Sequence, residues 1–153
     1  MANTYSQIYI HVVFTVKGRA NLIRKDFKDE LHKYIAGIIR NEEQKLLAIG
    51  GVSDHIHIFI GLKPDQKISD LVRIIKANSS KFINEKKYVK GKFNWQEGYG
   101  AFSYAQSQKD TVIKYIMNQE KHHIKKSFKE EYTELLKRFE IESSEKYLFE
   151  WLD

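Results

Sequence analysis

The alternation of apolar and polar side chains in two segments constrains the fold of this chain more than any other feature. Residues 8–17 run Ile-Tyr-Ile-His-Val-Val-Phe-Thr-Val-Lys, and residues 55–60 run His-Ile-His-Ile-Phe-Ile. Successive side chains of a strand point to opposite faces, so each segment is predicted to be a strand with one apolar face. In the second strand the isoleucines share the core face, and the other face carries His55, His57 and Phe59.

His55 and His57 are expected about 7 Å apart along one face of that strand. Two imidazoles at this spacing can converge on a single cation. They can equally be hydrogen-bonded polar side chains, so the pair alone leaves both roles open. Residues 50–54, Gly-Gly-Val-Ser-Asp, are predicted to form the turn before the strand, in which Asp54 either orients an imidazole or serves only the turn.

The spacing of apolar residues predicts further strands and helices around these two strands. The predicted order is a strand at 8–17, a helix at 24–41, strands at 45–51 and 55–60, a helix at 68–83 and a strand at 101–107. This β-α-β-β-α-β order predicts an α+β, ferredoxin-like antiparallel sheet, a fold that does not by itself define a function. A helix at 111–121, capped by Ser107 and Asp110, and a C-terminal helix around 132–139 are expected to follow.

Composition and length favour one globular domain covering residues 1–153. The chain has a single proline, no cysteine and 42% hydrophobic residues, so it has no evident linker and no disulfides. It has neither a leader-like N-terminus nor an apolar run near the roughly 20 residues that cross a bilayer. A soluble, cytoplasmic protein without a membrane partner is therefore expected.

Positive charge is concentrated in the middle of the chain. Residues 63–92 contain nine Lys or Arg against three Asp or Glu, within an overall net charge of +6. Such a surface suits a polyanion, although lysine-rich helices also present plain solvated faces. The candidate DNA contacts are the phosphate-binding lysines and two base-stacking aromatic residues: Lys76, Lys81, Lys86, Lys87, Lys90, Lys92, Trp95 and Tyr99.

Tyr115 and Gln119 are four residues apart on the predicted helix at 111–121, so they share one of its faces. Two imidazoles and an amide oxygen could hold a divalent cation that grips a scissile phosphate, and the Tyr115 hydroxyl could then attack the phosphorus. A phenol has a pKa near 10 and needs assistance from a metal or a base. The alternative is an ordinary amphipathic tyrosine at the rim of the core.

Four motifs together resemble the HUH single-tyrosine transposases of small bacterial insertion sequences, including the REP-associated tyrosine transposases. They are His55-Ile56-His57, Tyr115 with Gln119, Lys-Ala-Asn-Ser-Ser at 76–80, and Trp-Gln-Glu-Gly-Tyr-Gly-Ala-Phe-Ser at 95–103. The resemblance implies that His55, His57 and Gln119 ligate Mg²⁺ or Mn²⁺ and that Tyr115 forms a 5′-phosphotyrosine. It also implies a homodimer that binds and cuts single-stranded DNA with hairpin ends.

Other functions remain open from the sequence. A domesticated relative would act on chromosomal hairpins rather than on a mobile element, and a non-catalytic ferredoxin-like module would bind nucleic acid through charge and aromatic residues alone. A histidine phosphoesterase needs two His-x-Ser/Thr motifs, and this chain has neither. By ligand type alone, zinc or another transition metal would also suit the imidazole and amide ligands.

Overall fold

The computed structural model describes residues 3–121 and 126–142 of the chain. The elements are β1 (Tyr9–Thr15), α1 (Lys25–Asn41), β2 (Lys45–Val52), β3 (His55–Gly61), α2 (Ile68–Lys86), β4 (Gly100–Tyr104), α3 (Lys109–Met117) and α5 (Phe128–Arg138). The first six of these confirm the predicted ferredoxin-like order. Two features of the sequence lie outside the described residues. One is the aromatic segment Tyr-Leu-Phe-Glu-Trp-Leu at 147–152, expected to pack on the domain or on a partner subunit, and the other is the pair of histidines at 122 and 123.

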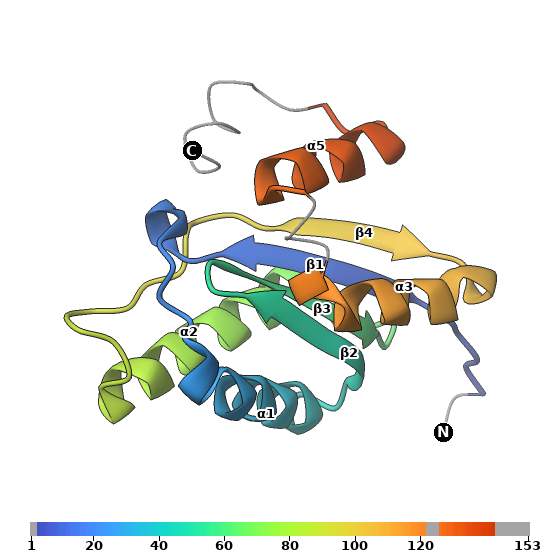
Figure 1. Ribbon diagram of the computed structural model, residues 1–153. Coiled ribbons are helices and arrows are strands. Elements are labelled where there is room, and N and C mark those ends of the chain that lie inside the picture. Colours follow the sequence, from blue (N-terminus) through green and yellow to red (C-terminus); the bar gives the residue numbers. More distant parts are fainter. Residues whose placement is uncertain (1–2, 122–125, 143–153) are drawn as a thin grey trace.

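The sheet has four antiparallel strands in the order β2-β3-β1-β4, with the two predicted alternating strands in its centre. In this register Thr15 of β1 lies opposite His55, and Val13 lies opposite His57. Helices α1 and α2 cover one face of the sheet, and α3 and α5 lie on the other (Figure 1). The molecule therefore has a helical layer on both sides of the sheet.

The isoleucine face of β3 forms the larger core, against α1 and α2. Ile56, Ile58 and Ile60 are each at most 1% exposed, and they pack with the apolar stripe of α1 that includes Leu31 and Ile35. Burying side chains of this size contributes roughly 1.5–3 kcal/mol each. The alternation in the sequence therefore predicted the orientation of this face correctly.

The opposite face of the sheet is buried as well, although the alternation suggested that it faces outward. Phe59 is fully buried under Val112 and Ile116 of α3. Val13 and Phe102 are buried under α5. The histidines on this face consequently lie between the sheet and a second layer of helices, out of water.

Two glycines let this second layer approach the sheet closely. A Cβ atom on Gly50 would lie 2.1 Å from the backbone oxygen of Ile116, and one on Gly100 would lie 2.7 Å from the Tyr132 hydroxyl. Gly50 and Gly51 belong to strand β2, which agrees with the strand predicted at 45–51, so these two glycines are not part of the predicted turn. The turn consists of Ser53 and Asp54 alone.

The segment from β4 to α3 also differs from the prediction. Strand β4 ends at Tyr104, and residues Gln106–Gln108 form a short 3₁₀ helix. Gln108 is in the N-cap position directly before α3 but gives the helix no side-chain cap, and its Oε1 instead accepts a hydrogen bond from the backbone N–H of Ala105 at 3.0 Å. The predicted cap by Ser107 is therefore wrong. Helix α3 ends at Met117, and helical backbone resumes at 119–121 after a turn.

Candidate active site

His55 and His57 are buried on the face of the sheet that α3 and α5 cover. They are 1% and 0% exposed, and their ring centroids are 5.1 Å apart. The carboxylate of Asp54 accepts a hydrogen bond from His55 Nδ1 at 2.7 Å. This hydrogen bond fixes the tautomer of His55 and leaves the lone pair on Nε2, directed into the site. Asp54 therefore orients an imidazole in addition to its place in the turn.

His57 is held by a third histidine, His11 of β1. His11 Nε2 lies 2.7 Å from His57 Nδ1, and the two rings stack with centroids 5.0 Å apart. Burial, reinforced by the neighbouring His57, lowers the pKa of His11 well below its ordinary value. A neutral His11 can accept the Nδ1 proton of His57, so that His57 Nε2 is the nitrogen available to a ligand.

Gln119 and Tyr115 reach the histidine pair from α3 and the turn that follows it. Gln119 is 1% exposed, and its Oε1 lies 3.3 Å from His55 Nε2. The Tyr115 ring lies perpendicular to that of His57, with centroids 5.8 Å apart. The structure thus brings together the four side chains that the sequence singled out, although the helix that was expected to carry both Tyr115 and Gln119 is interrupted between them.

A fifth side chain, Glu131 of α5, occupies the middle of this group and was not foreseen. Its Oε1 lies 3.0 Å from His57 Nε2 and 3.7 Å from His55 Nε2. Its Oε2 accepts hydrogen bonds from the Tyr115 hydroxyl and from Gln119 Nε2. A signal was present in the sequence, because Glu131 interrupts the apolar stripe of its helix at a position that is only 5% exposed.

The environment strongly disfavours the phenolate form of Tyr115. Burial, then the negative charge of Glu131 and the hydrogen bond to it, raise the pKa of the Tyr115 phenol well above its ordinary value. A nucleophilic role therefore requires either a base to take the proton or a nearby cation. Glu131 is in position to be that base.

The donor atoms of the site fit a divalent cation. One nitrogen from each of His55 and His57 and one oxygen of Glu131 lie within 4.8 Å of one another, and all three residues are buried. The amide oxygen of Gln119 adds a fourth donor beside them. Imidazole, amide and carboxylate groups are all ligands that divalent metals accept in proteins.

A cavity of about 330 Å³ between α3 and α5 leads to Tyr115 and Glu131. Its wall includes the cationic side chains of Lys126 and Arg138, and the Tyr104 ring lies on the same wall. This opening could admit a phosphate and part of a nucleotide to the phenol. Its wall carries charges of both signs, because Glu134 also lines the cavity and pairs with Lys126 at 2.7 Å.

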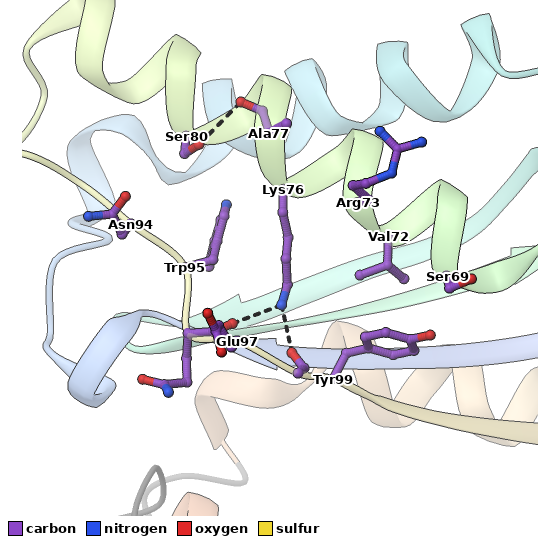
Figure 2. Close-up of a pocket in the computed structure, with 12 residues that line it drawn as sticks. Ser69, Val72, Arg73, Lys76, Ala77, Ser80, Asn94, Trp95, Glu97 and Tyr99 are labelled. Atoms are coloured by element: carbon purple, nitrogen blue, oxygen red, sulfur yellow. Dashed lines mark hydrogen bonds between the residues drawn. The ribbon is translucent and has the colours of Figure 1, made fainter.

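Two of the candidate DNA-binding residues lie instead in a pocket on the α2 side of the sheet, beside residues 94–99 (Figure 2). Lys76 Nζ donates hydrogen bonds to the carbonyls of Gln96 and Gly98, and burial lowers its pKa to about 8. Trp95 is 8% exposed, and its indole nitrogen donates to Ser79 Oγ at 2.9 Å. Both side chains thus hold residues 94–99 against α2.

The other candidates for DNA contact are more accessible. Tyr99 is half-buried on the rim of the same pocket. The remaining lysines are all exposed, at the end of α2 and in the segment after it: Lys81, Lys86, Lys87, Lys90 and Lys92. They belong to the layer on the opposite side of the sheet from the histidine pair. A duplex bound there would therefore lie apart from the buried site.

The fold and site together define the class of protein. A histidine pair on a central strand of a ferredoxin-like sheet, with a tyrosine brought beside it, is the arrangement that the HUH motifs imply. The family described as "Transposase IS200 like" matches residues 4–119, and the chain belongs to this family. This match confirms the resemblance that the sequence motifs indicated.

Individual relatives agree with this assignment. The ISDra2 transposase TnpA of Deinococcus radiodurans is 22% identical over 118 residues, which are 74% of this chain and 84% of the relative. A crystal structure described as a transposase from D. radiodurans R1 matches with a TM-score of 0.64 and 20% identity, over 78% of this chain and 95% of that one. A structure of a REP-associated tyrosine transposase bound to a REP hairpin matches with a TM-score of 0.56 and 14% identity, over 76% of this chain and 68% of that one.

In the described part of the chain, no helix combines the length and the apolar character needed to cross a membrane.

Proposed function

We propose that this transposase cleaves and rejoins single-stranded DNA in a metal-dependent reaction with Tyr115 as the nucleophile. The observation that carries the proposal is the meeting of Tyr115 and Gln119 with His55 and His57 in one buried site. A non-catalytic DNA-binding module would have no use for this convergence. The proposed assembly is a single domain over residues 1–153, acting as a homodimer.

In the proposed reaction the Tyr115 oxygen attacks the scissile phosphorus while its proton passes to Glu131. The bond from phosphorus to the 3′ oxygen breaks, which leaves a 5′-phosphotyrosine and a 3′-hydroxyl that takes up a proton from solvent. His55, His57 and Gln119 would hold Mg²⁺ or Mn²⁺, which supplies a Lewis acid for the phosphate oxygens. Since the new bond retains the energy of the phosphodiester, attack by another 3′-hydroxyl rejoins the strand.

The proposed substrate is single-stranded DNA with hairpin ends. Support comes from the matching fold of the REP-associated tyrosine transposase, whose structure contains a REP hairpin. The exposed lysines at 81–92 would contact the hairpin phosphates, where a point charge suffices. Paired hairpins that bracket the gene would favour a mobile element over a domesticated relative serving chromosomal hairpins.

Covalent adduct formation tests the nucleophile directly. The protein is incubated with labelled single-stranded DNA from the flanks of its gene and with Mn²⁺, and SDS-resistant adducts are resolved on a denaturing gel. We predict that Tyr115→Phe abolishes the adduct and retains DNA binding. Tyr34→Phe is the matched control, because Tyr34 is 39% exposed on α1, in the opposite layer. Undiminished adduct in Tyr115→Phe would place the nucleophile elsewhere.

The same assay tests the histidine pair. We predict that His55→Ala and His57→Ala each lose cleavage, by a factor of at least about 100, while circular dichroism shows a folded protein. Cleavage at the wild-type rate in either variant would contradict the assignment of these imidazoles as metal ligands.

A further inference from the structure

We infer that Glu131 is an additional ligand of the metal, supplied by α5, and this inference rests on the metal site of the proposed function. Helix α5 (Phe128–Arg138) lies beyond residues 4–119, the region that matches the transposase family. The sequence motifs of the family therefore do not include Glu131. Its position in the site is the basis of the inference.

The separations between donor atoms match those around a small divalent cation. Glu131 Oε1 is 3.0 Å from His57 Nε2 and 3.7 Å from His55 Nε2, and His55 Nε2 is 3.3 Å from Gln119 Oε1. Metal–ligand bonds of about 2.0–2.2 Å place neighbouring donors about 3.0 Å apart in an octahedron and about 3.4 Å apart in a tetrahedron. Two of these separations, 3.0 and 3.3 Å, agree with such values, and the ligand atoms of His55, His57 and Glu131 all lie within 4.8 Å of one another. Small shifts of the side chains would therefore bring the donors onto one ion.

The hydrogen bonds of these side chains also direct their lone pairs to a common point. Because the carboxylate of Asp54 accepts a hydrogen bond from His55 Nδ1, the His55 Nε2 lone pair faces the oxygens of Gln119 and Glu131. Gln119 uses its amide nitrogen to donate to Glu131 Oε2, so its oxygen must face His55. Lone pairs of nitrogen and oxygen that face one another at these distances repel unless a cation or a proton lies between them.

The two carboxylate oxygens of Glu131 contact different groups in this arrangement. Oε2 accepts from Tyr115 and Gln119, whereas Oε1 faces the histidine pair. Glu131 would therefore ligate the cation through Oε1 and hold the phenol through Oε2 at the same time. The nucleophile is thereby kept next to the ion that is to bind the phosphate.

A carboxylate changes the charge of the ligand set and hence the cations that it accepts. Two neutral imidazoles and an amide carry no charge and suit several transition metals, while a carboxylate favours the harder ions Mg²⁺ and Mn²⁺. Glu131 is 5% exposed, so its charge is largely desolvated and its attraction to a cation is strong. The inference therefore assigns to α5 a part in the choice of metal.

Direct metal binding, without DNA, tests the inference. Full-length protein is titrated with Mn²⁺, and free Mn²⁺ is followed by electron paramagnetic resonance. We expect Glu131→Gln, which keeps the size of the side chain, to weaken Mn²⁺ binding by about tenfold or more. Glu130→Gln is the matched control, because it removes the same charge from an exposed neighbour on α5 and should bind like the wild type.

Thermal unfolding provides a second readout. Saturating Mn²⁺ is expected to raise the Tm of the wild type and of Glu130→Gln, and to raise that of Glu131→Gln much less. Equal Mn²⁺ affinity in Glu131→Gln and wild type would overturn the role of Glu131 while leaving the proposed function intact. Failure of the wild type to bind Mn²⁺ would overturn both this inference and the metal site of the proposed function.

Discussion

At the scale of single residues, the site depends on His11, a side chain that lies behind one of the proposed metal ligands. His11 is fully buried, and its Nε2 lies 2.7 Å from His57 Nδ1. Among the described residues, its own Nδ1 has no hydrogen-bond partner. A buried polar group that lacks a hydrogen-bond partner lowers the stability of the fold. An apolar residue would therefore stabilise this position better, and stability alone does not explain a histidine here. Its orientation of His57 is the better explanation.

The role of His11 can be tested by replacing its imidazole with an apolar side chain that forms no hydrogen bond to His57. We predict that His11→Leu lowers the affinity for Mn²⁺ by about 10- to 100-fold, because His57 loses the group that fixes its tautomer and ring orientation. Mn²⁺ titration monitored by electron paramagnetic resonance measures this. If His11 only fills space, the substitution will change the thermal stability and leave the Mn²⁺ affinity as it was.

His32 illustrates a residue whose environment the sequence did not predict. It is half-buried on α1, and burial followed by the charge of Lys28 lowers its pKa to about 4. In the unfolded chain the pKa is about 6.5. Between these values the unfolded chain binds a proton that the folded chain does not, so stability falls as the pH drops from about 6.5 to 4.

Urea unfolding at pH 7 and pH 4.5 measures this contribution. We predict that the wild type loses about 2 kcal/mol more stability over this interval than His32→Gln does, since glutamine cannot take up the proton. Equal losses in the two proteins would mean that His32 is as accessible to protons in the folded state as in the unfolded state.

The sequence identified those site residues that belong to local patterns. His55 and His57 follow the alternation of a strand, and Tyr115 and Gln119 follow helical spacing. Glu131 stands in the sequence only as a carboxylate within the apolar stripe of its helix, and the side chains that it meets depend on how α5 packs against β4, a contact between segments far apart in the sequence. The spacing of apolar residues likewise did not predict that α3 ends at Met117, before Gln119.

At the scale of elements, the periodicity of apolar residues predicted the positions of most strands and helices. It did not predict which faces of the sheet the helices cover. The bounds of α1 and β2 agree with the sequence prediction to within one residue at each end. The predicted strand at 101–107 is shorter in the structure because a 3₁₀ turn replaces its end. The alternation did not predict that α3 and α5 bury the histidine face of the central strands, because this burial depends on tertiary packing.

The position of α3 over β2 depends on Gly50, and this dependence is testable. A Cβ atom at residue 50 would lie 2.1 Å from the backbone oxygen of Ile116, one residue after the proposed nucleophile. We predict that Gly50→Ala lowers the free energy of unfolding by about 1–3 kcal/mol and displaces Tyr115 enough to reduce adduct formation. Chemical denaturation and the adduct gel measure the two effects.

Gly37→Ala is the matched control for this substitution. Gly37 lies within α1, and a Cβ atom there would meet nothing within 4 Å. Alanine is expected to stabilise the protein by about 0.5–1 kcal/mol through helix propensity, with adduct formation unchanged. If the two substitutions had the same effect, close packing of α3 would not be the reason for glycine at residue 50.

At the scale of the whole molecule, the site is composite. Its side chains come from the two central strands, from the α3 segment, and from α5, which lies beyond the family match at 4–119. The motif at 76–80 and the start of the motif at 95–103 contact each other on the other side of the sheet, through Ser79 and Trp95. Phe102, near the end of the second motif, instead packs beside His11, with ring centroids 5.9 Å apart. The contact between Ser79 and Trp95 thus stabilises the layer that carries the exposed lysines.

In the proposed homodimer, the tyrosine could serve the histidine pair of its own chain or that of its partner. Within a single chain, Tyr115 already lies against His57, and the backbone of Ile116 lies against Gly50. We therefore predict that each chain assembles its own site. Tyr115→Phe and His57→Ala chains, one of them carrying a size tag, are co-expressed so that mixed dimers form, and adducts are resolved by size.

No adduct is expected from such mixed dimers, because neither chain has both a phenol and an intact histidine pair. Co-expression of wild type with a chain carrying both substitutions is the control, and it should give an adduct on the wild-type chain only. If the phenol were delivered to the partner instead, a mixed dimer would contain one intact site. An adduct would then appear on the His57→Ala chain, although its own ligand set is broken. In that case the reacting state would differ from the arrangement within one chain, where the ring centroids of His57 and Tyr115 are 5.8 Å apart.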